Sequence, residues 1–203
     1  MPLDAFAIEQ LRQARRINVV GTSGSGKSTF GRQLAELLEL PFYEMDQLFW
    51  RPDWQETPDE ELLARVQEVA DGPAWVIDGN YTRTIPVKWP RTQAVVWLDL
   101  SLARTLYQVT SRSIRRALSQ QELWAGTGNR ETLWKSFLSR DSVILWSART
   151  HRKNRTKYRT LMNSPEYAHI HFLRLESRRS TAACLASLKQ LVSGGSAEPS
   201  PAG

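Results

Sequence analysis

The sequence feature that most constrains the fold is the glycine-rich stretch GTSGSGKS at residues 21–28. It matches the pattern G-x-x-x-x-G-K-[ST] at every fixed position. The run before it, residues 17–20, is largely apolar and β-branched, as a buried strand should be. The residues after it, 29–40, carry phenylalanine and leucine at helical spacing, with polar residues between them. Strand, glycine-rich turn and helix in this order predict a loop that binds the phosphates of a nucleoside triphosphate.

The chemistry expected of this loop follows from its glycines and its lysine. Glycine adopts backbone conformations closed to other residues, so successive N–H groups can point into one concavity, which the positive end of the next helix also faces. Lys27 is expected to reach the β- and γ-phosphates of ATP, and Ser28 to hold Mg²⁺. The alternative is a glycine-rich turn with a chance lysine. The loop residues predicted to bind the nucleotide are Gly21, Ser23, Gly24, Ser25, Gly26, Lys27, Ser28 and Thr29.

The composition fits one globular domain with an anionic ligand. The 203 residues suit a single domain over 1–192, and the net charge of +6 favours nucleotide phosphates or nucleic acid as a partner. Cys184 is the only cysteine, which excludes an internal disulfide, and no Cys/His cluster suggests zinc. No apolar run approaches the ~20 residues of a membrane helix, and the N-terminus lacks a signal-peptide pattern. We therefore expect a cytoplasmic protein without a membrane partner.

Apolar runs and helical periodicity alternate along the chain. Strands are expected at 17–20, 42–46, 75–79, 94–99 and 170–175. Helices are expected at 3–16, 29–40, 58–70 with Thr57 as the cap, 101–118, about 130–162 and 179–192. The tail, 193–203, is expected to be disordered. This alternation predicts an α/β fold with a parallel sheet and helices on both faces.

Three carboxylates, Asp46, Asp78 and Asp99, are expected at strand ends, on the rim where the phosphate loop also lies. One carboxylate near Ser28 suffices for Mg²⁺, because this ion keeps several waters. Asp78 is favoured for that role, because a glycine follows it; Asp99, two residues before a helix cap, is the alternative. Asp46 is followed by an aromatic segment, so it could accept a proton from a substrate hydroxyl or orient that group.

These residues resemble the adenylate-kinase-like group of P-loop kinases, over about residues 17–177. They look most like small bacterial proteins labelled DNA topology modulation proteins or adenylate kinase-like. The motifs that carry the resemblance are 21–29, Tyr43-x-x-Asp46-x-x-x-Trp50-x-Pro52-x-Trp54, WVIDGNYTR at 75–83 and VWLD at 96–99. The resemblance implies a three-layer P-loop fold with strand order 2-3-1-4-5, and phosphoryl transfer from ATP. The sequence after the third strand differs from that of adenylate kinases, which argues against AMP as acceptor.

The resemblance also implies further site residues. Arg112 would pack on the adenine ring, and a lid of about 113–130, continuing into a helical region to about 162, would bring arginines over the phosphates. The catalytic candidates on that region are Arg149, Arg152 and Arg155, whose spacing suggests one helical face, although a solvated basic surface explains any one of them equally well. Residues expected around the acceptor are Asp46, Trp50, Arg51, Asn80, Tyr81 and Arg83.

Two functions follow from these patterns. The first is a kinase that transfers the γ-phosphoryl group of ATP to a small molecule or nucleotide. The alternative is a nucleic-acid-associated ATPase or regulator, suggested by the basic run 149–159 and by the DNA topology label. No helix-turn-helix, zinc site or RNA-binding signature supports the alternative.

Overall fold

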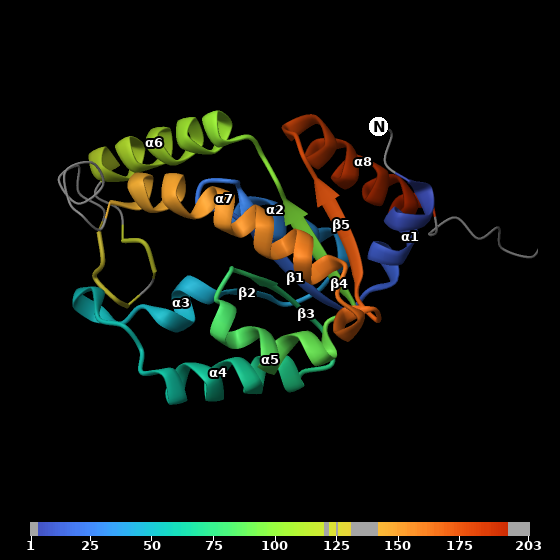
Figure 1. The fold of residues 1–203 in the computed structure, drawn as a ribbon, viewed down its shortest axis with the longest axis horizontal. Coiled ribbons are helices and arrows are strands. Elements are labelled where there is room, and N and C mark those ends of the chain that lie inside the picture. The colour runs from blue at the N-terminus through green and yellow to red at the C-terminus, as the bar shows by residue number, and fades with distance from the viewer. Residues whose placement is uncertain (1–3, 120–121, 125, 131–141, 195–203) are drawn as a thin grey trace, which may run out of the picture.

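The computed structural model describes residues 4–119, 122–124, 126–130 and 142–194. Its centre is a five-stranded parallel sheet in the order β2-β3-β1-β4-β5 (Figure 1). The strands are β1 (Arg16–Gly21), β2 (Phe42–Glu44), β3 (Trp75–Asp78), β4 (Ala94–Leu98) and β5 (His171–Leu175). All four pairings are parallel, so every strand ends at the same edge of the sheet. This confirms the predicted fold class and strand order.

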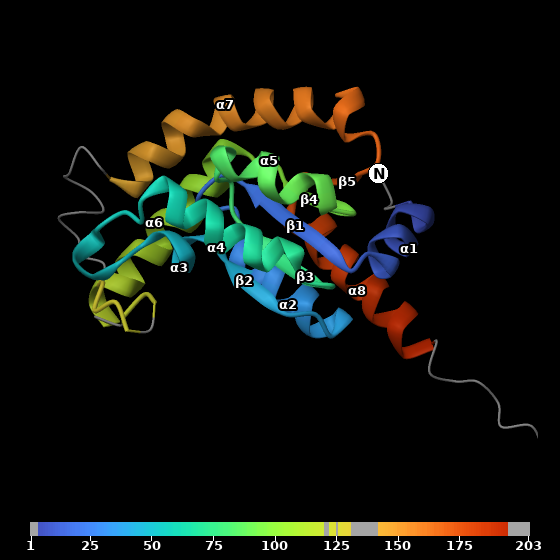
Figure 2. The same cartoon turned by 90° about the horizontal axis from the view of Figure 1, so that it is seen from below.

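Helices cover both faces of the sheet, as Figure 2 shows. On one face lie α1 (Ala5–Gln13), α2 (Lys27–Leu38) and α8 (Arg178–Gly194), and their apolar residues form one core cluster with β1 and β4. The opposite face is covered by α3 (Met45–Phe49), α4 (Asp59–Asp71), α5 (Ile85–Lys88) and α7 (Val143–Met162). The long helix α6 (Leu102–Ser119) follows β4 and packs beside α7. Among the described residues, no helix combines the length and the apolar composition needed to cross a membrane.

Short 3₁₀ turns join several of these elements. They are η1 (Pro52–Trp54), η2 (Thr82–Thr84), η3 (Trp89–Arg91) and η5 (Pro165–Tyr167). With α3, the turn η1 gives regular structure to part of the segment between β2 and α4, which the sequence indicated only as aromatic and irregular.

We call the residues expected around the acceptor, and the elements that carry them, the acceptor side; they are Asp46, Trp50, Arg51, Asn80, Tyr81 and Arg83. Two expected boundaries in this part of the chain are wrong. The second strand ends at Glu44, so Asp46 lies in the first turn of α3 rather than at a strand end. Thr57 is not the cap of α4, whose N-cap is Pro58. The Thr57 hydroxyl instead donates to the Leu48 carbonyl oxygen at 3.2 Å, and this bond ties the start of α4 to α3.

The ends of other predicted segments also shift. Residues 113–119 of the expected lid are the last turns of α6, because the helical pattern continues to Ser119. Ser193 and Gly194, expected in the disordered tail, extend α8. The expected helical residues 131–141 and the tail residues 195–203 lie outside the described residues.

Candidate active site

The phosphate loop joins β1 to α2 at the carboxyl edge of the sheet. Helix α2 begins at Lys27, so the N–H groups of its first turn face the loop. Gly24 has a φ of +85°, and a Cβ there would lie 2.7 Å from the Val109 Cβ and 2.8 Å from the Thr105 carbonyl oxygen. Glycine at this position therefore lets α6 pack directly against the loop.

Lys27 and Asp78 influence each other electrostatically beside the loop. The Lys27 ammonium lies 3.4 Å from the Thr22 carbonyl oxygen, and Asp78 is buried at the end of β3, next to Val19 of β1. Burial raises the pKa of Asp78 to about 6, while Lys27 and a hydrogen bond from the Ser28 hydroxyl act in the opposite direction. Burial lowers the pKa of Lys27, and Asp78 and Asp46 oppose this effect. Lys27, Ser28, Asp46 and Asp78 thus lie close enough to influence one another electrostatically.

The two candidate carboxylates for Mg²⁺, Asp78 and Asp99, differ in their partners. Asp99 is buried, and its carboxylate is held by two arginines, Arg155 at 2.8 Å and Arg174 at 2.5 Å. Asp78 instead hydrogen-bonds Ser28, the residue that the loop pattern assigns to the metal.

The residues present fit ATP and Mg²⁺. The Ser25 hydroxyl is buried and has no hydrogen-bond partner among the described residues, so it is available to an added phosphate oxygen. In the same part of the chain, no group of three or more His, Cys, Asp and Glu side chains could hold a metal ion by itself. Mg²⁺ does not need such a cage, because one or two protein oxygens, phosphates and waters complete its coordination.

The predicted acceptor residues lie on α3, η1 and the segment after β3. The Tyr81 hydroxyl donates to Oδ1 of Asp46 at 2.6 Å. The Phe49 ring packs on Tyr81 with centroids 5.0 Å apart and on Trp50 with centroids 4.7 Å apart. The Trp54 ring continues this row at 5.6 Å from Trp50. One aromatic wall therefore leads from Asp46 to Trp54.

The two arginines predicted on the acceptor side are both ion-paired. Arg51 pairs with Glu61 of α4, and Arg83 pairs with Asp59 at the start of that helix. The Arg83 guanidinium also lies 5.0 Å from the centroid of the Phe49 ring. Local sequence patterns could not indicate these partners, because each pair joins residues at least ten positions apart.

Asn80 connects the acceptor side to the phosphate loop. Its amide oxygen accepts from the Gly21 N–H at 2.9 Å and from the Tyr158 hydroxyl at 3.0 Å, and its amide nitrogen donates to the Gly21 carbonyl oxygen. The structure therefore places Asn80 as a brace between β1, β3 and α7, and its predicted contact with an acceptor stays a prediction.

Helix α7 crosses the carboxyl edge of the sheet and contacts the loop, a role that the sequence did not reveal. The Ser147 hydroxyl donates to the Ser23 carbonyl oxygen at 2.8 Å. One turn further, His151 Nε2 lies 2.9 Å from the carbonyl oxygen of Leu100. Ser147 and His151 are both buried, and their spacing of four residues could have suggested a small polar face directed inward.

The three catalytic arginine candidates do not share a face of α7. Arg155 points toward the sheet and pairs with Asp99, whereas Arg149 and Arg152 are exposed. Three residues turn a helix by about 300°, so two such steps separate Arg149 from Arg155 by about 120°. The charge of Arg112 contributes to lowering the pKa of Lys27, which indicates that Arg112 lies near the loop.

The described part of the expected lid, 122–124 and 126–130, is docked on the acceptor side. Asn129 is buried; its side-chain oxygen accepts from the Trp54 N–H at 3.0 Å, and its nitrogen donates to the Arg51 carbonyl oxygen at 2.8 Å. The Trp124 ring lies against Trp54, with centroids 5.9 Å apart. The segment is thus attached to η1 by two hydrogen bonds and a ring contact.

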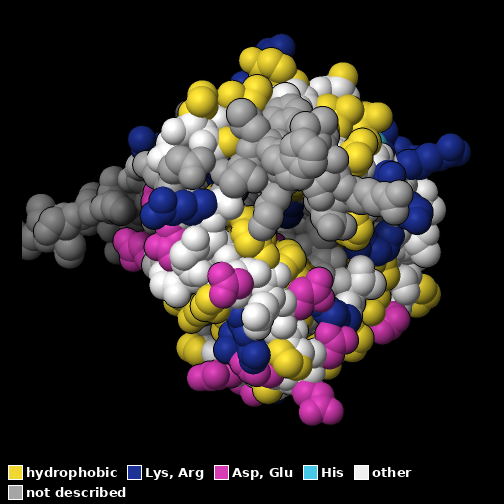
Figure 3. Space-filling view, turned by 90° about the vertical axis from the view of Figure 1, so that its left-hand side faces the viewer, with side chains coloured by type: hydrophobic (Ala, Val, Ile, Leu, Met, Phe, Trp, Pro, Cys, Tyr) yellow, Lys and Arg dark blue, Asp and Glu magenta, His cyan; other side chains and the backbone are white. Residues whose placement is uncertain are grey.

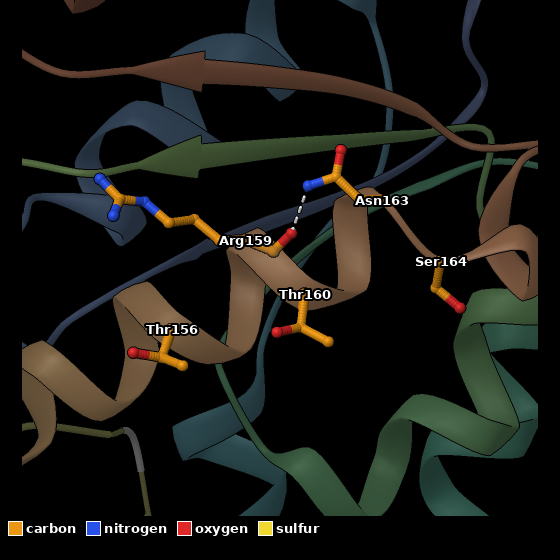
Figure 4. Close-up of a pocket in the computed structure, with 5 residues that line it drawn as sticks. All are labelled: Thr156, Arg159, Thr160, Asn163 and Ser164. Atoms are coloured by element: carbon orange, nitrogen blue, oxygen red, sulfur yellow. Dashed lines mark hydrogen bonds between the residues drawn. The ribbon is translucent and has the colours of Figure 1, made fainter.

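A separate pocket lies at the C-terminal end of α7. Thr156, Arg159, Thr160, Asn163 and Ser164 line it, and the Asn163 amide donates to the Arg159 carbonyl oxygen at 2.7 Å (Figure 4). Its lining includes no residue of the phosphate loop and no strand-end carboxylate. The chemistry therefore belongs to the loop and the carboxyl edge of the sheet rather than to this pocket.

Part of this chain is similar in sequence to shikimate kinases. A family model described as shikimate kinase matches residues 23–60, which include Lys27 and Asp46. A shikimate kinase of Prochlorococcus marinus (strain NATL2A) is 30% identical over 118 residues, which are 51% of this chain and 60% of that protein. Shikimate kinase 1 of Escherichia coli (strain K12 / DH10B) is 51% identical over 37 residues, 18% of this chain and 21% of that protein. The chain thus matches less than two thirds of the length of these curated relatives.

A solved structure shows the same fold. The shikimate kinase from Acinetobacter baumannii in complex with shikimate superposes with a TM-score of 0.54 at 18% identity and covers 94% of this chain and 99% of that chain. None of these matches supports the DNA topology modulation label. In its phosphate loop and in its fold, the chain is similar to P-loop kinases.

Proposed function

We propose that this protein is an ATP-dependent kinase that phosphorylates a hydroxyl group of a small-molecule acceptor. The observation that carries the proposal is the phosphate loop between β1 and α2, with Asp78 at the end of the neighbouring strand β3 and Asp46 in the first turn of α3. A triphosphate-binding lysine, a carboxylate suited to Mg²⁺ and a carboxylate suited to an acceptor hydroxyl are needed together for phosphoryl transfer. The similarity to shikimate kinases supports this reading, although it covers only part of their length.

On the phosphate side, the roles follow from geometry. The loop N–H groups, the Ser25 hydroxyl and Lys27 would bind the β- and γ-phosphates, and Ser28 and Asp78 would hold Mg²⁺, either directly or through water. The metal supplies neutralisation of the charge on the phosphate oxygens. The charge of Arg112 acts on Lys27, which supports a contact of Arg112 with the nucleotide, and Arg149, Arg152 and Arg155 stay candidates for cations that stabilise the transition state.

On the acceptor side, Asp46 would take the proton. The acceptor hydroxyl oxygen forms a bond to the γ-phosphorus as the bond from that phosphorus to the β,γ-bridging oxygen breaks, and ADP leaves. The hydroxyl proton passes to Oδ2 of Asp46, while Tyr81 holds Oδ1. Burial and the nearby Asp46 raise the pKa of Tyr81, so its hydroxyl stays protonated and keeps donating. Tyr81 is therefore a positioning residue for Asp46.

ATP consumption by the purified chain tests the proposal. We expect that one compound in a panel of nucleosides, nucleoside monophosphates, sugars, polyols and shikimate raises turnover well above the basal rate, and that Lys27→Ala abolishes the increase. Lys153→Ala, which removes an exposed lysine of α7, is the matched control. Stimulation by duplex DNA alone would instead favour the nucleic-acid-associated ATPase, and binding of ATP without transfer to any compound would count against a kinase.

A further inference from the structure

The segment that supplies the acceptor side is acidic within a basic chain. Residues 44–83, which run from the end of β2 through α3, α4 and β3 to η2, contain ten Asp and Glu but three Arg and no Lys, a formal charge of −7. The complete chain carries +6. Figure 3 shows acidic side chains gathered in the lower half of the face that it presents, over the region of α3 and α4. Two of these carboxylates pair with arginines outside the segment, Glu44 with Arg32 and Asp71 with Arg91, and acidic residues still outnumber basic ones.

The arginines in this acidic segment already have carboxylate partners. Arg51 pairs with Glu61, which also receives Arg65 at 2.5 Å, and Arg83 pairs with Asp59. A carboxylate or phosphate on an acceptor would therefore have to displace an existing partner. It would also enter a field in which acidic residues outnumber basic ones, and like charges brought together cost binding energy.

Helix α7 adds a cation near this side without reversing the balance. The Lys157 ammonium donates to the Thr82 hydroxyl at 3.0 Å and lies 4.5 Å from the Tyr158 ring centroid. Burial lowers the pKa of Lys157 to about 8, so part of its positive charge is already lost at mildly alkaline pH.

The acceptor side is also rich in aromatic surface. Phe49, Trp50, Trp54 and Tyr81 form a continuous row, and Trp124 of the docked segment extends it. Trp50, Trp54 and Tyr81 are partly exposed, so their rings can contact a ligand. Aromatic faces bind flat rings and the C–H faces of sugars without requiring charge.

We infer that the acceptor is an uncharged hydroxyl compound with a flat or C–H-rich face, such as a sugar, polyol or nucleoside, rather than a carboxylate or a phosphate ester. This inference rests on the proposed kinase function and names the acceptor class for the same site. One hydroxyl of the acceptor gives its proton to Asp46 and becomes the phosphate ester, while the rest of the molecule lies on the aromatic row. ADP is the other product.

Matched pairs of compounds that differ in one charged group test the inference. The pairs are glucitol and gluconate, adenosine and adenosine monophosphate, and the methyl ester of shikimate and shikimate. With ATP and Mg²⁺, we expect Lys27-dependent phosphorylation of the neutral member of at least one pair, with kcat/KM ~10-fold or more above that of its anionic partner. Equal or better use of the anionic members would overturn the inference and leave the kinase intact. If no compound is phosphorylated while ATP still binds, the kinase proposal itself fails, and the inference fails with it.

A charge variant sharpens the test. The double substitution Asp59→Asn and Glu61→Gln removes both partners of Arg51 and Arg83 while it keeps the side-chain shapes. We expect the preference within the best pair to shift toward the anionic member by about tenfold or more. The control pair Glu60→Gln and Glu68→Gln makes the same net change on α4 at exposed positions outside these ion pairs and should shift the preference far less. An equal shift in both variants would show that the arginine pairs do not set the acceptor class.

Discussion

The phosphate side and the acceptor side of the site are built in different ways. The phosphate side is one contiguous stretch, residues 21–28, whose backbone N–H groups and single lysine would bind the nucleotide under the proposed function. The acceptor side uses side chains drawn from α3, η1, α4 and the segment after β3, and it is aromatic and acidic. Asn80 connects the two sides. It lies in the segment after β3, and its side-chain amide hydrogen-bonds the backbone of Gly21 in the loop.

From this contrast we expect the two sides to differ in their specificity for ligands. A loop that binds phosphate through backbone amides depends on few side chains and suits any triphosphate. Specificity for the acceptor must come from the side chains that contact it. On the acceptor side of this protein, these are ion-paired charged residues and partly exposed aromatic rings. Substitutions on the acceptor side should therefore alter acceptor use while ATP binding is kept, and those that touch the loop should do the reverse.

The largest effect is expected from Asp46→Asn. Without a carboxylate to accept the hydroxyl proton, kcat should fall by ~10²–10⁴, the usual contribution of general-base catalysis. Steady-state kinetics with the identified acceptor, and ATP titration by calorimetry, measure the two sides separately. Asp53→Asn makes the same change at an exposed position of η1 and should leave kcat within about twofold. If Asp46→Asn keeps full kcat, then Asp46 does not take the proton.

The contrast also explains how much the sequence could predict. The strand and helix that flank the glycine-rich loop follow from contiguous patterns, and the strand order follows from the family resemblance; the structure confirms both. The sequence predicts Asp46 at the end of a short strand over 42–46. The last two residues instead begin α3, where Met45 is fully buried among Phe49 and Leu62. Local propensity could not reveal this packing, which depends on α4 and β3.

Contacts between distant segments were not predictable from the sequence. Asn18 was counted within an apolar strand, yet its amide donates to the Ile77 carbonyl oxygen and accepts from the Trp89 indole, each at 2.9 Å. The glycine after Asp78 is also required by packing within the protein: a Cβ at Gly79, where φ is +132°, would lie 2.6 Å from the Met45 Cβ. The polar Asn18 and the small Gly79 are therefore fixed by contacts with distant residues that the sequence does not identify.

The next largest effect is expected from Lys88→Met, beneath the acceptor side. The Lys88 ammonium is fully buried, 3.4 Å from the Gly79 carbonyl oxygen, and burial lowers its pKa to about 7 from 10.5. Between these values the unfolded chain binds more protons at this residue, so the group makes wild-type stability rise with pH. Lys88→Met should remove this rise and gain most at pH 7 and below, on the order of 2–4 kcal/mol.

Urea unfolding at pH 6.5, 8 and 10 measures this effect. The exposed Lys153→Met serves as the control and should change stability by the same small amount at each pH. A stability difference between Lys88→Met and wild type that is constant with pH would show that Lys88 has an ordinary pKa. ATP binding in the presence of Mg²⁺ is measured alongside, because the charge of Lys88 also acts on Asp78.

A smaller effect is expected from Asn129→Ala, which frees the docked segment from η1. Two hydrogen bonds to the backbone of Arg51 and Trp54 are lost, about 1–2 kcal/mol in total. The acceptor KM should rise roughly 5–30-fold while the ATP KM stays near its wild-type value. Gln55→Ala, at an exposed position next to Trp54, should change neither constant. A rise confined to the ATP KM would place this segment on the nucleotide instead.

The smallest effect is expected from Ser147→Ala, and it falls on the phosphate side. The Ser147 hydroxyl holds the Ser23 carbonyl oxygen from α7, so its loss should cost about 0.5–1.5 kcal/mol and raise the ATP KM by roughly 2–10-fold, with the acceptor KM unchanged. Thr150→Ala is the matched control, because its hydroxyl donates within α7 to the Trp146 carbonyl oxygen at 2.7 Å. Together with Asn129→Ala, this variant tests the separation directly: if either raises both KM values alike, the two sides of the site are coupled through α7 rather than independent.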